Sequence, residues 1–139
     1  MICITGDLHG DLSRLRHKNS KKLKKGDSLI ICGDFGCIWD GSSKENATLK
    51  ALGKKKFNVL FVDGCHENFD LLESYPIEEW NGGKVHKIRP SVIHLMRGQV
   101  FTFAGRKIFT FGGAKSHDIS AGILEPDDPE FEKKKKKLN

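Results

Sequence analysis

The segment that decides the fold is Met1–Asp11, MICITGDLHGD, in which a short apolar run ends in a glycine turn that carries two aspartates and a histidine. The same arrangement returns in Ser28–Gly36, SLIICGDFG, and in Asn58–Asn68, NVLFVDGCHEN. Short apolar runs bounded by turn residues are typical of strands buried in a parallel sheet. Because the carboxyl ends of such strands open on one edge of the sheet, where ligands bind, we expect the three turns to share one pocket.

Residues of metal-ligand type lie in all three turns. Asp7 and His9 offer a carboxylate and an imidazole two residues apart, which can hold one side of a divalent ion, and Asp34 can bridge two ions. Two ions about 3.5–4 Å apart clamp the attacking and leaving oxygens of a phosphoryl centre and generate a hydroxide nucleophile. His66 follows the third run, where it can protonate the departing oxygen. Three such turns in succession indicate a hydrolytic metal site.

The two halves of the chain differ in pattern. The first half predicts a βαβαβ unit, and after Gly82-Gly83 short alternating runs predict antiparallel hairpins. The expected class is therefore α/β, with a layered β-sandwich flanked by helices. The expected strands are Ile2–Thr5, Leu29–Cys32, Phe57–Val62, Lys84–Ile88, Val92–Leu95, Gln99–Phe103 and Lys107–Phe111, and the expected helices are a segment capped by Asp11 that ends near Lys25, Lys44–Leu52 and Glu67–Ser74.

Length and composition fit one domain. The chain has 139 residues, of which 37% are hydrophobic and 30% charged, enough to bury a core. No apolar stretch approaches the ~20 residues of a membrane span, and the amino terminus runs directly into an acidic turn, unlike a signal peptide. We therefore expect a cytoplasmic protein with no membrane partner. The four cysteines have no disulfide-framework spacing and are expected to be reduced.

The net charge of +6 comes mostly from one run. Five of the 24 basic side chains lie in Lys133–Lys137, and without them the basic residues nearly balance the 18 acidic ones. Like-charge blocks are usually solvated or act as loose interaction arms. Nucleic acid is therefore not indicated as a partner beyond this basic tail. We expect one domain over residues 1–128 and a basic tail over residues 129–139.

The turn motifs resemble the signature of calcineurin-like metallophosphoesterases. The resemblance rests on Gly6–Asp11, on Gly33-Asp34 and on Gly64–Glu67, and it extends from Met1 to about Asp128. It implies a double β-sandwich flanked by helices and a centre of two divalent ions, often manganese, iron or zinc. It further implies that Asp7 and His9 bind the first metal, that Asp34 bridges both, and that His66 is the acid close to the substrate phosphate. Gly33–Asp40 reads GDFGCIWD, which does not fit the serine/threonine phosphatase branch.

Two departures from the family pattern bear on activity. Cys65 stands where the family usually has an asparagine that binds the second metal, and a thiolate is a softer ligand that favours zinc. The Gly-His and Gly-His-x-His motifs that complete the family's metal shell are also missing, so we expect this chain to be a truncated N-terminal portion of such an enzyme. His117 precedes the usual place of those motifs and is not assigned as a ligand. His86 and His94 lie in alternating strands and are expected to be cross-strand or surface residues.

The function expected from these residues is metal-dependent hydrolysis of a phosphoester, as a phosphatase or phosphodiesterase. The metal residues are Asp7, His9, Asp34 and Cys65, the catalytic acid is His66, and one ion is expected to bind with fair affinity and a second weakly. The alternatives are an inactive binding or interaction domain of the same fold, and a structural zinc protein that uses Cys32, Cys37 and Cys65. Nothing identifies the substrate, although Trp39, Phe35 or Trp80 could stack on a base instead of packing as a lid.

Overall fold

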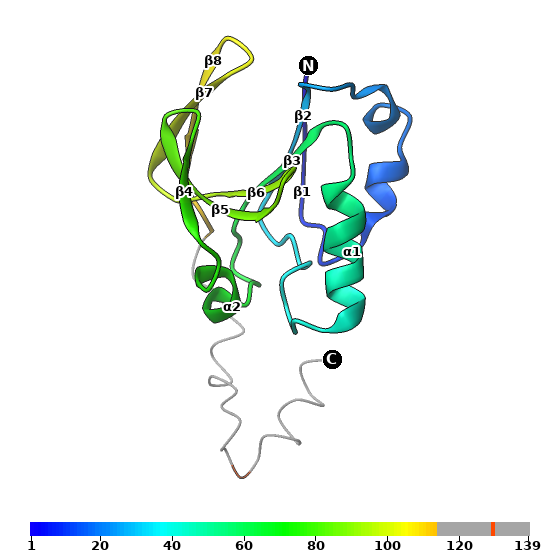
Figure 1. The fold of residues 1–139 in the computed structure, drawn as a ribbon, viewed down its shortest axis with the longest axis vertical. Helices are drawn as coiled ribbons and strands as arrows, with labels where there is room; N and C mark the ends of the chain where they lie inside the picture. The colour runs from blue at the N-terminus through cyan, green and yellow to red at the C-terminus, as the bar shows by residue number, and fades with distance from the viewer. Residues whose placement is uncertain (114–128, 130–139) are drawn as a thin grey trace.

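The computed structural model describes residues 1–113 and residue 129. Within this part of the chain, a six-stranded mixed sheet has the strand order β1-β2-β3-β6-β5-β4, and β7 and β8 pair separately (Figure 1). In chain order the elements are β1 (Ile2–Gly6), η1 (Leu12–Arg16), η2 (Ser20–Lys22), β2 (Ser28–Cys32), α1 (Ser43–Gly53), β3 (Asn58–Val62), α2 (Phe69–Glu73), β4 (Ile77–Trp80), β5 (Gly83–Arg89), β6 (Val92–Leu95), β7 (Gln99–Phe103) and β8 (Arg106–Thr110).

The first three strands lie side by side and run parallel, as the sequence predicts. Ile2 is opposite Ser28, which is opposite Asn58, and the pairing continues in register to the strand ends. Four of the five residues of β2, and four of the five of β3, are buried. The continuous apolar runs of β2 and β3 thus match strands covered on both faces. The expectation of burial is wrong for β1, which lies at the edge of the sheet, has no buried residue and leaves Ile4 70% exposed. The carboxyl ends of all three strands lie at one edge of the sheet.

Successive side chains of these strands supply two different cores. Leu29 and Ile31 of β2 pack with α1 residues Leu49 and Leu52, whereas Ile30 packs with Phe101 of β7. Figure 1 shows α1 on one side of the six-stranded sheet and the β7–β8 ribbon on the other. The predicted class, α/β with layered sheets flanked by helices, is confirmed.

The prediction of one helix from Asp11 to about Lys25 is wrong. Two short 3₁₀ segments, η1 and η2, take its place, because His17 adopts an extended conformation and ends the first of them. The predicted cap is present, since Ser13 N donates to Asp11 Oδ1 at 2.8 Å. The segment contains few apolar residues. Because a continuous helix is stabilised mainly by packing of an apolar face, this segment does not form one.

The expected helices Lys44–Leu52 and Glu67–Ser74 are present as α1 and as the shorter α2. Ser42 caps α1 by accepting from Glu45 N at 3.2 Å. Asn68 caps α2 by accepting from Leu71 N at 3.0 Å. Asn68, which takes this capping role, therefore lies outside the second helix.

The second half of the described chain is not one meander. β4, β5 and β6 pair antiparallel within the main sheet, where β6 also lies parallel to β3, while β7 and β8 form the second sheet. The edge strand β4 was not expected from the sequence. Its first three residues, Ile77, Glu78 and Glu79, are exposed, so they lack the alternation that marks a half-buried strand.

In the part of the chain that the structure describes, no helix is both long and apolar enough to cross a bilayer. His117 and the lysine run Lys133–Lys137 lie outside the described residues. The division into a domain over residues 1–128 and a tail stays a prediction.

Candidate metal centre

The loops that follow β1 and β2 are joined by backbone hydrogen bonds. The amides of Leu8 and His9 both donate to the carbonyl oxygen of Asp34, at 3.0 and 2.8 Å, and Gly10 N donates to Phe35 O at 3.0 Å. The third loop is attached through Asp34 as well, because its Oδ1 accepts from His66 N at 2.9 Å. Asp34 thus links all three strand ends and fixes where their side chains point.

Three residues of this edge have a left-handed backbone. Asp7, His9 and Asp34 have φ values of 56°, 45° and 47°. Residues other than glycine rarely adopt this region, and each such residue costs about 1–3 kcal/mol unless its surroundings impose it. Such strain gathers at functional sites, and here it falls on three of the residues that the sequence motifs select.

His9, Asp34 and His66 form a group that can hold a metal ion. One ligand atom from each lies within 4.8 Å of the others. Asp34 Oδ2 is 3.7 Å from His9 Nε2 and 3.6 Å from His66 Nδ1. The side chains of His9 and His66 are 55% and 40% exposed, so an ion and a substrate can reach them from solvent. Two imidazoles and a carboxylate suit zinc, iron or manganese.

Asp7 and Cys65, the other two predicted metal residues, lie at the margins of this group. Asp7 Oδ1 is 2.7 Å from His9 Nε2, the same nitrogen that faces Asp34. Two carboxylates therefore approach one imidazole nitrogen, as the shared-site prediction requires. Cys65 Sγ is 3.5 Å from His66 Nδ1. Neither residue belongs to the three-residue group, so their role as ligands stays a prediction.

Asp34 has the charge state that a ligand needs. Its partial burial by itself raises the pKa, but hydrogen bonds from the backbone and side chain of His66 outweigh this, and the pKa is lowered. The carboxylate is therefore ionised at neutral pH.

Glu67 is a positioning residue that sequence analysis missed. Its carboxylate is buried and accepts from Phe35 N at 2.8 Å and from Gly64 N at 3.4 Å, which holds the second and third loops together. Burial raises its pKa, although the backbone amides act in the opposite direction. Its position directly after His66 in the motif was the available signal, but its partner Phe35 comes from a loop 32 residues away.

Glycine is required in the third loop by close packing. A Cβ at Gly64 would overlap Asp34 Oδ1. Any side chain here would therefore displace the carboxylate at the centre of the candidate site. The glycine of the third motif thus serves the approach of two loops.

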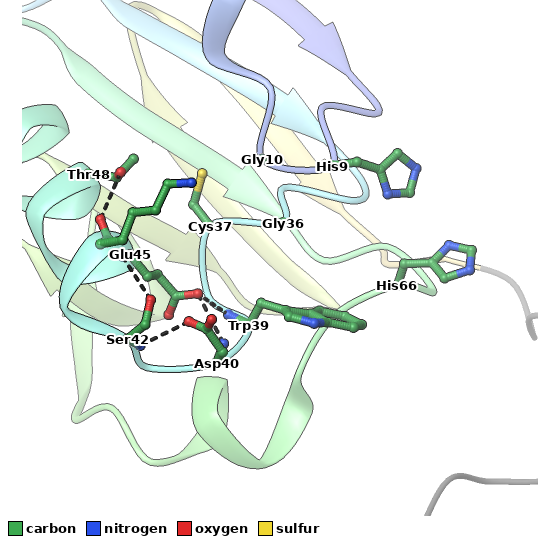
Figure 2. Close-up of a pocket in the computed structure, with 11 residues that line it drawn as sticks. His9, Gly10, Gly36, Cys37, Trp39, Asp40, Ser42, Glu45, Thr48 and His66 are labelled. Atoms are coloured by element: carbon green, nitrogen blue, oxygen red, sulfur yellow. Dashed lines mark hydrogen bonds between the residues drawn. The ribbon is translucent and has the colours of Figure 1, made fainter. Parts of the chain in front are cut away.

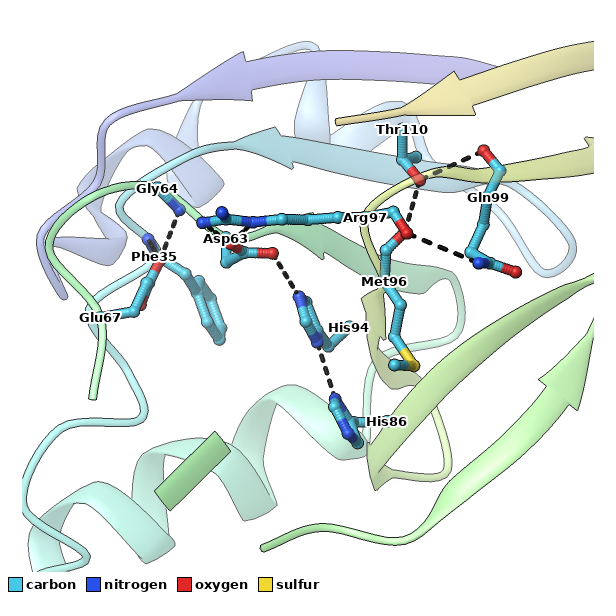
Figure 3. Close-up of polar contacts among 10 residues, drawn as sticks. All are labelled: Phe35, Asp63, Gly64, Glu67, His86, His94, Met96, Arg97, Gln99 and Thr110. Atoms are coloured by element: carbon cyan, nitrogen blue, oxygen red, sulfur yellow. Dashed lines mark hydrogen bonds and ion pairs between the residues drawn. The ribbon is translucent and has the colours of Figure 1, made fainter. Parts of the chain in front are cut away.

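A second polar cluster lies behind the third loop (Figure 3). Asp63 is 2% exposed, and its Oδ2 accepts from Arg97 Nε at 2.5 Å while its Oδ1 lies 2.9 Å from His94 Nε2. His94 Nδ1 is in turn 3.0 Å from His86 Nδ1. Burial of Asp63 by itself raises the pKa of its carboxyl group, but the hydrogen bonds from His94 and Arg97 outweigh this effect. The pKa is therefore lowered, and the carboxylate is ionised.

His86 and His94 were expected to be cross-strand or surface residues. They are paired across β5 and β6, as predicted, but both are buried, so the surface alternative is wrong. Both are only 4% exposed. The two rings stack on each other, and His94 also stacks on Phe61 and contacts Asp63.

The cysteines do not support the structural zinc alternative. Cys32 is exposed and is the last residue of β2, whose other four residues are buried. Cys37 is buried, and burial raises the pKa of its thiol to about 12. Within residues 1–113, Cys32, Cys37 and Cys65 do not form a metal-holding group.

An open pocket adjoins the candidate metal group. It has a volume of about 430 Å³, and Figure 2 shows His9 and His66 at one side, the start of α1 at the other and Trp39 between them. The volume lies within the range of small-molecule sites. The site therefore has room for more than a phosphate.

The fold and the strand-end cluster together agree with the resemblance of the motifs, and the comparison of sequences settles the class. Residues 1–138 match the calcineurin-like phosphoesterase family, and the chain belongs to that family of metal-dependent phosphoester hydrolases. No solved structure matches the chain.

A curated relative from Candida albicans, the CCR4-Not complex 3'-5'-exoribonuclease subunit Ccr4, is 31% identical over 78 residues. The match covers 50% of this chain and 10% of the relative, so the chain spans about a tenth of that protein's length.

Proposed function

We propose that this chain carries a metal-dependent phosphoester hydrolase site at the carboxyl ends of β1, β2 and β3. One observation carries the proposal: His9, Asp34 and His66, from three loops, have ligand atoms within 4.8 Å of one another on an open edge. Ion pairs that serve only the fold would not require a left-handed backbone in two of the three loops and close packing at a glycine in the third. Family membership supplies the reaction class.

Asp7, His9 and Asp34 are the residues proposed to hold the ion, with Cys65 beside a second position. A bound divalent ion, with manganese, iron and zinc as the candidates, supplies a Lewis acid and lowers the pKa of water. Asp34 contributes negative charge from the centre of the group, and the amide of His66 keeps its carboxylate oriented. Cys65 would favour zinc if its thiol is deprotonated, because thiolates are soft ligands.

His66 is proposed as the general acid. Its side chain is 40% exposed and Nδ1 lies 3.6 Å from Asp34 Oδ2, so the carboxylate stabilises the protonated ring that would donate to the departing oxygen. His66 also belongs to the metal-holding group. If His66 instead acts as a ligand, its removal will weaken metal binding as well as turnover.

A second candidate function is a non-catalytic binding domain of the same fold. Cys65 favours it, because a neutral thiol is a poor replacement for an oxygen ligand of manganese. Such a domain would retain the metal group and the adjacent pocket without turnover.

The test is to measure metal content and hydrolysis on the same preparation. We expect about one tightly bound ion per chain, and slow hydrolysis of p-nitrophenyl phosphate or bis-p-nitrophenyl phosphate with manganese. The two substrates separate monoesterase from diesterase activity. His66→Ala should slow turnover by roughly 10²–10⁴-fold, as for loss of a general acid.

His17→Gln is the matched control, because His17 is an exposed histidine remote from the cluster. Metal binding without hydrolysis of either ester would favour the binding domain. Turnover that survives His66→Ala would remove His66 from the reaction.

A further inference from the structure

We propose that the pocket beside the metal group receives the organic part of the substrate, with Trp39 as a stacking surface, so that the preferred substrates are phosphoesters bearing a flat aromatic ring. The inference rests on the phosphoester hydrolase function proposed above and names its substrate class. A nucleoside and a simple aryl group share this chemistry.

The pocket connects the proposed site of the phosphate with Trp39. His9 and His66 line it together with Gly10, Gly36 and Trp39. Figure 2 shows Gly10 beside His9, and Gly36 in the loop that leads through Cys37 to Trp39. A Cβ at Gly36 would come within 2.5 Å of Gly10 N, so the two loops that line the pocket meet here backbone against backbone. A flat group can therefore extend from the histidines towards the indole.

Trp39 is held firmly by its backbone while its ring is open. Its amide donates to Glu45 Oε2 and its carbonyl oxygen accepts from Asn68 Nδ2, each at 2.6 Å. The preceding residue, Ile38, is 1% exposed, whereas Trp39 is 55% exposed. An aromatic ring on a fixed backbone loses little conformational entropy when a ligand stacks on it. The loop thus holds the backbone of Trp39 in place and leaves its indole ring exposed.

The charges around the pocket favour a single phosphate with a neutral organic group. Glu45 is engaged by the amides of Trp39, Asp40 and Gly41. Hydrogen bonds from Ser42 lower the pKa of Asp40, so this carboxylate remains ionised. With Lys44 as the cation in the lining, the charges are of mixed sign. The pocket therefore offers no positive field for a second phosphate, while its carboxylates can accept from hydroxyl groups.

The experiment compares three phosphoesters on the full chain loaded with Mn²⁺: adenosine 5'-monophosphate, phenyl phosphate and glycerol 2-phosphate. Trp39 and Trp80 are the two tryptophans of the chain, so in the Trp80→Phe protein the fluorescence reports on Trp39. We expect the two aromatic esters to quench it and glycerol 2-phosphate to leave it unchanged. Trp80→Phe is also the matched control, because Trp80 packs against Phe101 and Phe103 between the sheets.

Trp39→Leu should weaken binding of the two aromatic esters by about 5- to 100-fold, the range for a ring stacked on an aromatic side chain. Binding of glycerol 2-phosphate should change less than about twofold, and Trp39→Phe should restore most of the lost affinity, since a ring remains. A purely structural role for Trp39 would weaken all three ligands alike. Equal binding of adenosine monophosphate and phenyl phosphate supports recognition of the ring alone, and tighter binding of the nucleotide supports a nucleoside.

Two failures are distinguishable. If glycerol 2-phosphate binds and the aromatic esters gain nothing from Trp39, the stacking proposal is overturned and the proposed hydrolase function stands. If none of the three esters binds the metal-loaded chain, the proposed function fails, and the stacking proposal fails with it.

Discussion

The molecule contains two histidine pairs whose rings are almost equally far apart. One pair, His9 and His66, lies at the strand-end edge, and the other, His86 and His94, is formed across β5 and β6. Their ring centroids are 5.4 and 5.3 Å apart. Each pair also lies against an aspartate, Asp34 in the first and Asp63 in the second. The composition of the two clusters is thus almost the same, and their surroundings decide what each can do.

The exposed pair is arranged for a ligand. The rings of His9 and His66 are tilted by 59°, and each has a nitrogen close to Asp34 Oδ2. Several ligand atoms that face one point in solvent create a place where a cation stabilises the group. The left-handed backbone of Asp7, His9 and Asp34 is accepted there, which is the pattern of a functional site.

The buried pair makes hydrogen bonds within its own cluster. His86 and His94 are stacked within 7° of parallel, and His94 uses one ring nitrogen on Asp63 and the other on His86. Arg97 neutralises the second oxygen of Asp63. No buried side-chain nitrogen or oxygen among the described residues lacks a partner. The difference teaches that the same residue types can form a candidate metal group at an open edge or a hydrogen-bonded network in the interior.

The largest expected effect comes from breaking the exposed cluster at its centre. Asp34→Asn should weaken metal binding by more than about 100-fold, exceeding the ~10–100-fold cost of losing an outer-shell partner. The reason is that Asp34 lies within 4 Å of both histidines and supplies the charge between them. Titration calorimetry with Mn²⁺ and Zn²⁺ measures the change.

Asp63→Asn is the matched variant in the buried cluster. If the two clusters are as different as their surroundings indicate, it should leave metal affinity within about threefold. A comparable loss of affinity in both variants would contradict the assignment of the metal group to the strand-end edge.

The second-largest expected effect is on the free energy of unfolding, which should distinguish the two clusters. Asp63→Asn should lower the free energy of unfolding by about 2–3 kcal/mol in the presence of a chelator, because it leaves Arg97 and buried His94 without their charged partner. Asp34→Asn should cost little under the same conditions, since its histidine partners are solvated. Urea unfolding followed by circular dichroism measures both.

Asp70→Asn serves as the control for this pair, because Asp70 is exposed at the start of α2. Stability equal to the parent protein in Asp63→Asn would mean that the buried cluster is not needed for the fold.

The sequence predicts the exposed cluster far better than the buried one, for a physical reason. Asp7 and His9 follow the edge strand β1, and Asp34 and His66 follow the buried strands β2 and β3. Because all three strands are parallel, short local patterns place these four residues at one edge. The parallel strands, α1 and the two-layer class follow from the same patterns. Asp63 meets His94 only because β6 lies parallel to β3, and that pairing depends on which of several apolar runs joins the main sheet.

Other misses have a similar origin. β4 pairs with β5 although its residues are exposed, so nothing in its own pattern marks it. Glu67 accepts from an amide of another loop, a contact that exists only after the fold has formed. The 3₁₀ segments replace a helix because tertiary packing, and not the cap at Asp11, decides how far a helix extends.

The smallest expected effect is the pH dependence that the buried pair imposes on folding. Burial, followed by the charge of His94, lowers the pKa of His86, while Glu73 and Asp63 act in the opposite direction. A histidine whose pKa is lower in the folded chain binds fewer protons there than in the unfolded chain. Its contribution to stability is therefore complete above the unfolded value of about 6.5 and is lost as the pH falls through it. One histidine gives a slope of at most about 1.4 kcal/mol per pH unit.

His86→Gln should reduce this slope between about pH 7 and pH 5, because glutamine can occupy the hydrogen bond to His94 without titrating. His17→Gln, at an exposed histidine, should leave the slope unchanged. Urea unfolding at half-unit pH steps with a chelator measures both, so that metal release from His9 and His66 does not contribute. The ionised carboxylate of Asp63 is lost only at lower pH, because its pKa is depressed, and this separates the two effects along the pH axis. An unchanged slope in His86→Gln would mean that His86 accepts protons as readily as histidine in water, and the contrast between the two pairs would then rest on exposure alone.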